Sequence, residues 1–144
     1  MLVNNVKETL LVKFNKDNAI FPYLTMEDVT WTGIEIWLQG QCNSRVTITA
    51  IGNSVNFSGS KVLNFNRRDI AVDLKGLKIP GKRKDYTTLY QIITALHDKC
   101  GVPLVTSEFI NLGLPANGPI TIQPTTTCMA YMPTTSIALE FAET

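Results

Sequence analysis

Short alternations of apolar and polar residues dominate the chain, which is the pattern of β-strands with two unlike faces. They occur in five segments, at residues 34–39, 45–51, 61–66, 119–123 and 136–142. Glycine, asparagine and serine between the second and third segments suit tight turns, so these two strands are predicted to form a hairpin. A shorter apolar run at residues 10–14, which ends at a turn-forming cluster at 15–18, predicts one more strand.

One segment follows the helical period instead. Its apolar stripe consists of Leu89, Ile92, Ile93, Leu96 and Cys100. Asp85 or Thr87 can cap the start of this helix, and Gly101 suits a left-handed cap at its end. The stripe predicts an amphipathic helix at about residues 86–100 and a buried thiol at Cys100. Shorter helical turns are predicted at 25–29, where Asp28 can reciprocate the cap, and at 107–111.

These elements together predict an α+β fold. Its main part is an antiparallel β-sheet or sandwich, and the helix at about 86–100 packs on one face. We find no linker, low-complexity tract or internal repeat, so residues 1–144 are expected to form a single domain.

The composition adds a hint about partners. Charged residues make up 17% of the chain, below the usual share of about 25%, which leaves more surface for protein contacts. The net charge of +1 produces no long-range attraction to nucleic acid or to anionic membranes. Because no apolar run approaches the roughly 20 residues that span a bilayer, no membrane partner is expected either.

Groups that perform chemistry are scarce. His97 is the only histidine, and no nucleophile motif accompanies it. His97 and Cys100 could share a helix face as metal ligands, but Cys100 continues the apolar stripe, and no phosphate-binding glycine motif is present. We therefore predict no catalytic residue, no metal, no cofactor and no small-molecule substrate, and we expect that the protein is not an enzyme.

Basic residues form the sharpest charge feature. They are Lys75, Lys78, Lys82, Arg83 and Lys84, which flank Pro80-Gly81. Such a loop could contact nucleic-acid phosphates, but no stacking aromatic residues are interleaved, so a solvated loop or the rim of a protein interface is favoured. Arg67 and Arg68 could pair with carboxylates of a neighbouring subunit.

Aromatic and methionine residues supply the remaining interface candidates. Trp37 falls on the polar face of its strand if Ile34, Ile36 and Leu38 point inward. It is then either an interface anchor or part of a second core layer, and both readings stay open. Tyr131 and Met132 follow a threonine-rich run and suit a packed contact.

Taken in order, the chain resembles a domain of unknown function that recurs in virion structural proteins of large tailed bacteriophages. The stretches that carry the resemblance are residues 21–29 (FPYLTMEDV), 46–50 (VTITA), 63–67 (LNFNR) and 96–104 (LHDKCGVPL). The basic residues 82–84 depart from the pattern of that family.

The resemblance implies a non-enzymatic structural subunit of the tail, neck or baseplate, made in the host cytoplasm and found in the virion. Its partners would be copies of itself and other virion proteins. Capsid decoration is the alternative, and a nucleic-acid-binding accessory protein that uses residues 75–84 is a second one.

Overall fold

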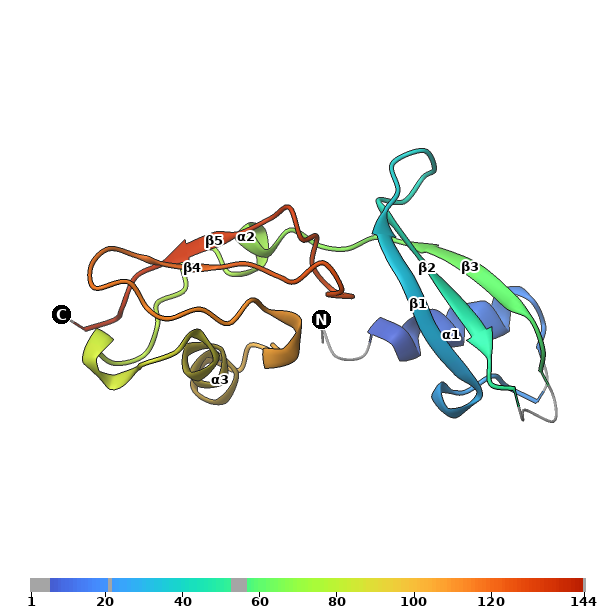
Figure 1. The fold of residues 1–144 in the computed structure, drawn as a ribbon, viewed down its shortest axis with the longest axis horizontal. Helices are drawn as coiled ribbons and strands as arrows, with labels where there is room; N and C mark the ends of the chain where they lie inside the picture. The colour runs from blue at the N-terminus through green and yellow to red at the C-terminus, as the bar shows by residue number, and fades with distance from the viewer. Residues whose placement is uncertain (1–5, 21, 53–56, 144) are drawn as a thin grey trace. The chain divides into compact units, whose positions relative to one another are not determined.

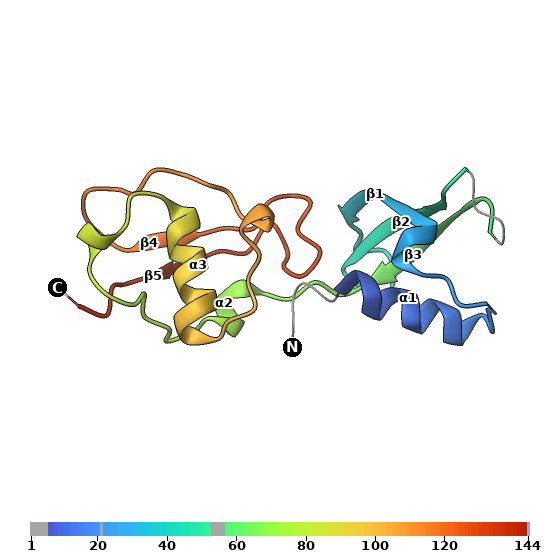
Figure 2. The same cartoon turned by 90° about the horizontal axis from the view of Figure 1, so that it is seen from below.

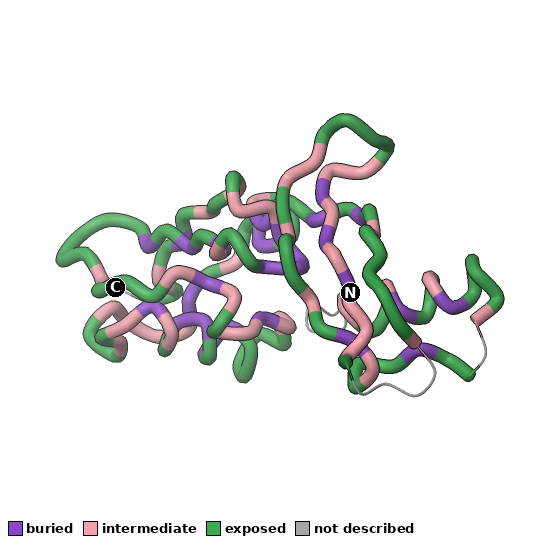
Figure 3. The backbone as a smooth tube through the Cα atoms, turned by 45° about the vertical axis from the view of Figure 1, so that its right-hand side comes forward, coloured by how far each residue is buried: buried purple, intermediate pink, exposed green. Residues whose placement is uncertain are grey.

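The structure is a computed structural model that describes residues 6–20, 22–52 and 57–143. These residues divide into two compact units, an N-terminal unit of residues 6–67 and a C-terminal unit of residues 68–143. Buried residues occur in both (Figure 3). The assignment of residues 1–144 to one domain stays a prediction.

The N-terminal unit is a helix packed on a sheet. Helix α1 (Val6–Asp17) is followed by the short helical turn η2 (Met26–Asp28) and by three strands, β1 (Val29–Ile36), β2 (Ser44–Ala50) and β3 (Ser60–Phe65). The sheet is antiparallel in the order β1-β2-β3, and α1 covers one of its faces (Figures 1 and 2).

The core of this unit lies between α1 and the sheet. Leu11 of α1 is buried with Leu24, Val29 and Ile48, and Trp31 packs against this cluster. The predicted hairpin of β2 and β3 is confirmed. The strand predicted at residues 10–14 is wrong, because these residues lie inside α1.

A β-bulge in β1 decides which side chains face the core. Thr32 is paired with Thr47 and Glu35 with Arg45, so the two residues Gly33 and Ile34 occupy the space opposite one residue of β2. Gly33 has a φ of 64°, a conformation that favours glycine and is typical of such bulges. The extra residue shifts the alternation by one position after Thr32.

The bulge brings two apolar patterns onto one face. Before the bulge, Val29 and Trp31 pack in the cluster under α1. After it, Ile34 and Ile36 lie on that same face of the sheet. Leu38, which we predicted to point inward, lies beyond the end of β1 and is 72% exposed.

The C-terminal unit has its own sheet and helix. Its helices are α2 (Ile70–Asp73) and α3 (Leu89–Cys100), with helical turns η3 (Arg83–Asp85) and η4 (Thr106–Glu108), and its strands are β4 (Ile120–Ile122) and β5 (Ile137–Leu139). Strands β4 and β5 pair antiparallel, and α3 lies across one face of them (Figures 1 and 2). Ile79 extends this sheet by a parallel bridge to Phe141.

Helix α3 largely follows its sequence pattern. Leu89, Ile92, Ile93 and Leu96 are buried, and Gly101 ends the helix in a left-handed cap with a φ of 70°. Thr88, and neither Asp85 nor Thr87, is the N-terminal cap. Cys100 is exposed, so the buried thiol that we predicted there is wrong. All four residues from His97 to Cys100 are exposed, so the buried part of the stripe ends at Leu96.

The architecture confirms the predicted α+β class with antiparallel sheets and a helix on a sheet face. The turn predicted at residues 25–29 is present as η2. Of the turn predicted at 107–111, only residues 107 and 108 are helical, because η4 begins at Thr106 and ends at Glu108.

Candidate interaction groove

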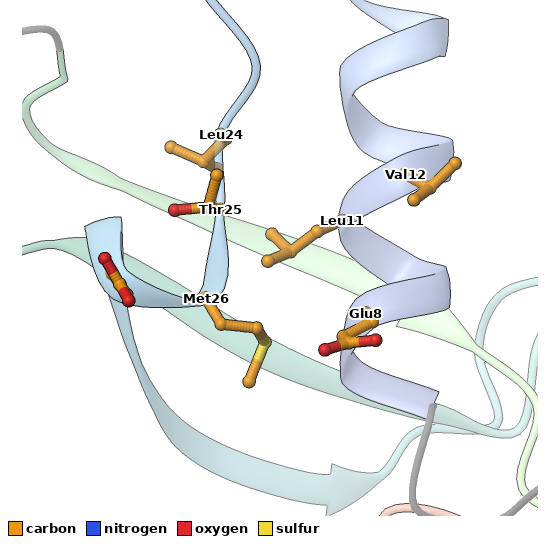
Figure 4. Close-up of a pocket in the computed structure, with 7 residues that line it drawn as sticks. Glu8, Leu11, Val12, Leu24, Thr25 and Met26 are labelled. Carbon is orange, nitrogen blue, oxygen red and sulfur yellow. The ribbon is translucent and has the colours of Figure 1, made fainter.

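An open groove of about 470 Å³ lies between α1 and the chain segment that leads into β1 (Figure 4). Its lining residues are Glu8, Leu11, Val12, Leu24, Thr25, Met26 and Glu27. Figure 4 shows Leu11, Val12 and Glu8 on the helix, with Leu24, Thr25 and Met26 on the facing segment. Both walls therefore belong to the N-terminal unit.

Asn15 holds the two walls of the groove together. Its side-chain N–H donates to the Leu24 carbonyl over 2.9 Å, and its carbonyl accepts from the Leu24 N–H over 3.0 Å. Asn15 is only 6% exposed, so both bonds are shielded from water. Because Leu24 lies outside any helix or strand, this one side chain supplies both hydrogen-bonding partners of its backbone.

The turn after Leu24 positions the remaining groove residues. The Asp28 carboxylate accepts from the Thr25 backbone N–H over 2.8 Å and from the Thr25 hydroxyl over 2.9 Å. This is the reciprocal bond that we predicted for Asp28. It fixes the first turn of η2 and thereby the positions of Met26 and Glu27.

The groove combines an apolar lining with acidic charge. Val12 is 66% exposed and Met26 is 37% exposed, although both are large hydrophobic residues. Among the seven lining residues, the charged ones are Glu8 and Glu27, and both are acidic. An exposed apolar surface beside two carboxylates suits a segment that carries aliphatic side chains and a lysine or arginine.

Trp37, a predicted interface anchor, lies on the opposite face of the N-terminal sheet. The Arg45 guanidinium stacks on its ring with 3.4 Å to the ring centroid, and Arg45 also pairs with Glu35. Both Glu35 and Trp37 reach this face because of the bulge at Gly33. Trp37 as a whole is half-buried, and its roles as an interface anchor or as part of a second core layer both stay predictions.

Arg67 and Arg68 have different surroundings. Arg67 is 3% exposed, and its Nε donates to the Ser44 hydroxyl over 2.7 Å. Arg68 forms a bidentate pair with Asp73, with both bonds at 2.7 Å. The burial of Arg67 differs from the exposed, partner-facing position that we expected for it.

Tyr131 and Met132 lie beside Arg68. A parallel bridge joins Arg68 to Tyr131, and the Met132 N–H donates to the Arg68 carbonyl over 2.9 Å. Tyr131 is 3% exposed, and it lies close enough to the Asp73 carboxylate to lower the pKa of that group. Arg68, Asp73 and Tyr131 thus form one internal cluster, and Tyr131 contributes to the core of the C-terminal unit rather than to an exposed contact.

This cluster predicts a loss of stability in alkali. Burial, and then the charge of Asp73, raise the pKa of Tyr131 above its ordinary value near 10. The folded chain keeps this proton at a pH at which the unfolded chain releases it, so stability is complete below about pH 10 and falls above it. We expect a decline of up to about 1.4 kcal/mol per pH unit in the free energy of unfolding.

Denaturant titrations of wild type and Tyr131→Phe between about pH 9 and pH 11.5 measure this effect. The phenylalanine variant should show a shallower decline, while Tyr23→Phe, at a site 67% exposed, should behave as wild type. Equal slopes for wild type and Tyr131→Phe would contradict the assignment. At acidic pH the sign is reversed, since Arg68 lowers the pKa of Asp73 and its contribution is lost as the carboxylate is protonated.

The basic segment is partly engaged within the C-terminal unit. The Arg83 guanidinium donates to the carbonyls of Pro115 and Gly118 and lies 5.0 Å from the Phe141 ring centroid. The Lys78 ammonium pairs with Glu140 over 3.3 Å. Arg83 therefore fixes the loop before β4.

The neighbours of Arg83, Lys82 and Lys84, differ from it in their surroundings. Lys82 is half-buried and its backbone N–H donates to Asp85, whereas the Lys84 side chain is exposed. In the alternative in which residues 75–84 bind nucleic acid, Lys78 and Arg83 are therefore already engaged and are not free to contact phosphates.

His97 is exposed at the end of α3, and its Nδ1 lies 2.9 Å from a carboxylate oxygen of Asp98. Within residues 6–20, 22–52 and 57–143, no group of three or more His, Cys, Asp or Glu side chains is placed to hold a metal ion. Over the same residues, no helix is both long and apolar enough to cross a membrane.

The groove was not predicted from the sequence. Residues 10–14 of its helix were assigned to a strand, and its exposed residues Val12 and Met26 are separated by thirteen residues, so no local periodicity links them. A usable signal existed in the Thr25 to Asp28 spacing, which correctly marked the turn that carries one wall.

Comparisons with known proteins give one match. A model described as a family of unknown function (DUF7941) matches residues 2–141. No curated protein and no solved structure is significantly similar to the chain.

Proposed function

The chain belongs to the family of unknown function DUF7941, whose model covers nearly all of it. Because this family has no known function, we propose the function of the chain from its own residues. We propose that it is a non-enzymatic structural subunit of a tailed-phage virion, in the tail, neck or baseplate. It acts by packing against copies of itself and against other virion proteins. The resemblance of residues 21–29, 46–50, 63–67 and 96–104 to domains of virion structural proteins supports the virion assignment.

The interaction groove is the observation that carries the proposal of a packing role. A contiguous patch of exposed apolar side chains on a folded domain is typical of a surface that another protein covers. In the groove, Val12 and Met26 are exposed above the buried floor of Leu11 and Leu24. The acidic residues Glu8 and Glu27 select a cationic partner by charge complementarity.

The partner is therefore a segment of a neighbouring virion protein that carries aliphatic side chains next to a lysine or arginine. A segment of this kind places its apolar residues on Leu11, Val12 and Met26 and its cation between the two glutamates. A stable contact of this type buries on the order of 800 Å² per partner, so the groove supplies the centre of a larger interface.

Mass spectrometry of purified virions tests the assignment. We expect the protein in intact particles and in isolated tails of the phage that carries the gene. Recovery from tailless heads, with none in tails, would assign it to capsid decoration instead. Its absence from intact particles would remove the proposal.

A matched pair of variants tests the groove. Val12→Glu adds a third carboxylate to the groove, and we expect it to reduce the copies per particle about tenfold or more. Val72→Glu is the control, since Val72 is 68% exposed against 66% for Val12 but lies in the C-terminal unit. Quantitative mass spectrometry of particles made with each variant gives the result. Equal incorporation of the two variants would contradict a docking role of the groove.

A further inference from the structure

The edge strand β3 presents a row of backbone groups that pair with no described segment. The Ala50 N–H donates to the Gly59 carbonyl over 2.9 Å, which sets the phase of the β2–β3 ladder. Hydrogen-bonded and non-bonded pairs alternate in an antiparallel ladder, so Ser60, Val62 and Asn64 belong to non-bonded pairs. Their N–H and C=O groups point away from β2. Among residues 6–20, 22–52 and 57–143, no backbone hydrogen bond reaches these groups from elsewhere.

The two edges of the N-terminal sheet differ. The bulge at Gly33 interrupts β1, and bulges increase local twist and discourage the addition of a further strand. Strand β3 keeps its register along its whole length, and it contains no proline and one charged residue, Lys61. Val62, at its centre, is 47% exposed. These are the features of an edge that accepts another strand.

We propose that β3 of a second copy of this chain pairs with this edge in antiparallel orientation, about a two-fold axis through Val62. Val62 then faces its own equivalent, Ser60 faces Asn64 of the second copy, and Lys61 faces Leu63. The hydrogen-bonded pairs are Val62 with Val62 and, on either side of it, Ser60 with Asn64. Each of these three pairs exchanges two bonds, so the pairing forms about six backbone hydrogen bonds. The two three-stranded sheets become one continuous sheet.

The residues around the edge favour a second copy as the occupant. The two-fold register places no lysine opposite a lysine, and it sets the exposed apolar side chain of Val62 against an identical one. A groove beside β3 is lined by Lys13, Asp17 and residues 61–64, so both signs of charge border the edge. Lys13 and Asp17 neutralise each other, and the remaining cation, Lys61, faces Leu63 of the second copy in this register.

This pairing deepens the proposed assembly with copies of itself and rests on that proposed function. It uses β3 and none of the residues that line the interaction groove between α1 and η2. The copy number in particles of Val12→Glu tests the groove, while the association of the purified protein tests the edge, so each can fail alone.

Sedimentation equilibrium of the purified chain over a range of concentrations tests the edge. We expect a reversible dimer for wild type. Val62→Pro removes the outward N–H without touching the β2 ladder, and proline is tolerated at such an edge position. It deletes both central bonds of the pairing, so we expect the dimer dissociation constant to rise about 10- to 100-fold.

A charge pair at the same position tests the two-fold axis itself and does not depend on a proline. Val62→Lys and Val62→Glu should each dimerise about tenfold more weakly than wild type, because like charges then lie directly opposite each other. An equal mixture of the two should restore dimers that contain one chain of each kind. Val62→Thr, which keeps the N–H and adds no charge, should dimerise like wild type.

Three results would overturn the inference. They are a wild-type chain that stays monomeric at all concentrations, a Val62→Pro dimer of unchanged strength, and a lysine and glutamate mixture that forms no mixed dimer. Circular dichroism of each variant verifies that it is folded before its association is measured.

Discussion

Replacement of Asn15 by leucine should lower the free energy of unfolding by about 2–4 kcal/mol. Leucine has the same number of side-chain heavy atoms and the same branch point, and it favours the helix, so neither a cavity nor helix propensity accounts for a loss of this size. The loss comes from the backbone N–H and C=O of Leu24, which both bond the Asn15 side chain and lie at a residue only 7% exposed. Each buried group left without a partner costs about 1–3 kcal/mol.

Tryptophan fluorescence during denaturant unfolding measures this change. Trp31 and Trp37, the two tryptophans of the chain, both lie in the N-terminal unit, so the signal reports the unit that contains Asn15. Asn18→Leu is the control, because the Asn18 side chain donates to the Phe14 carbonyl at an exposed position where water can replace it. If Asn15→Leu and Asn18→Leu unfold at the same denaturant concentration, Asn15 does not act as a clamp.

Truncation of Ile92 to alanine should destabilise the C-terminal unit by about 2–5 kcal/mol. Ile92 lies on α3 at 0% exposure, so the change removes apolar contacts and leaves a cavity in the core between α3 and the residues around it. Burial is the reason for the size of the effect, because the helix propensity of alanine exceeds that of isoleucine and acts in the opposite direction.

Hydrogen exchange of the α3 backbone amides, together with circular dichroism, measures this loss. Thr94→Ala is the matched control, since Thr94 occupies the exposed side of the same helix two residues away. It should change stability by no more than about 0.5 kcal/mol. Equal losses of protection in Ile92→Ala and Thr94→Ala would show that α3 does not pack through this face.

Patterns that involve residues close together in the sequence predicted the β2–β3 hairpin, helix α3 and the turn at Asp28 correctly. The period-2 alternation at residues 45–51 and 61–66 correctly gave the β2–β3 hairpin, because one face of each strand is buried against α1. The stripe from Leu89 to Leu96 correctly gave α3 for the same reason. The carboxylate of Asp28 could be assigned to its turn because the bond to Thr25 spans only three residues.

Helix α1 shows where such reasoning fails. Only Leu11 and Asn15 of this helix are buried, so its apolar period is weak, and one of the two inward residues is polar. The short run at residues 10–14 therefore resembled a strand. What fixes α1 in place is the bond of Asn15 to Leu24, nine positions away, and no local pattern encodes a contact of this kind.

The candidate interface residues show a second limit. Charge and aromatic character can be read from the residue types, but the internal partners of these side chains cannot. Arg83 binds carbonyls of residues more than thirty positions away, and Tyr131 interacts with Asp73, which lies 58 positions earlier in the chain. In a sequence, an arginine or tyrosine that lies at an interface cannot be distinguished from one that lies in a core. Only the tertiary contacts separate the two cases.

The bulge at Gly33 also bears on how members of the family are to be aligned. Its additional residue sets the inside-outside order of everything in β1 that follows it. A relative one residue shorter between Thr32 and Glu35 would need no bulge, and its residues aligned with Glu35 and Ile36 would keep the same faces of the sheet. A gap placed elsewhere in β1 would instead align outward polar residues with inward apolar ones. Gap placement in this strand therefore decides whether two such sequences are judged compatible with the same fold.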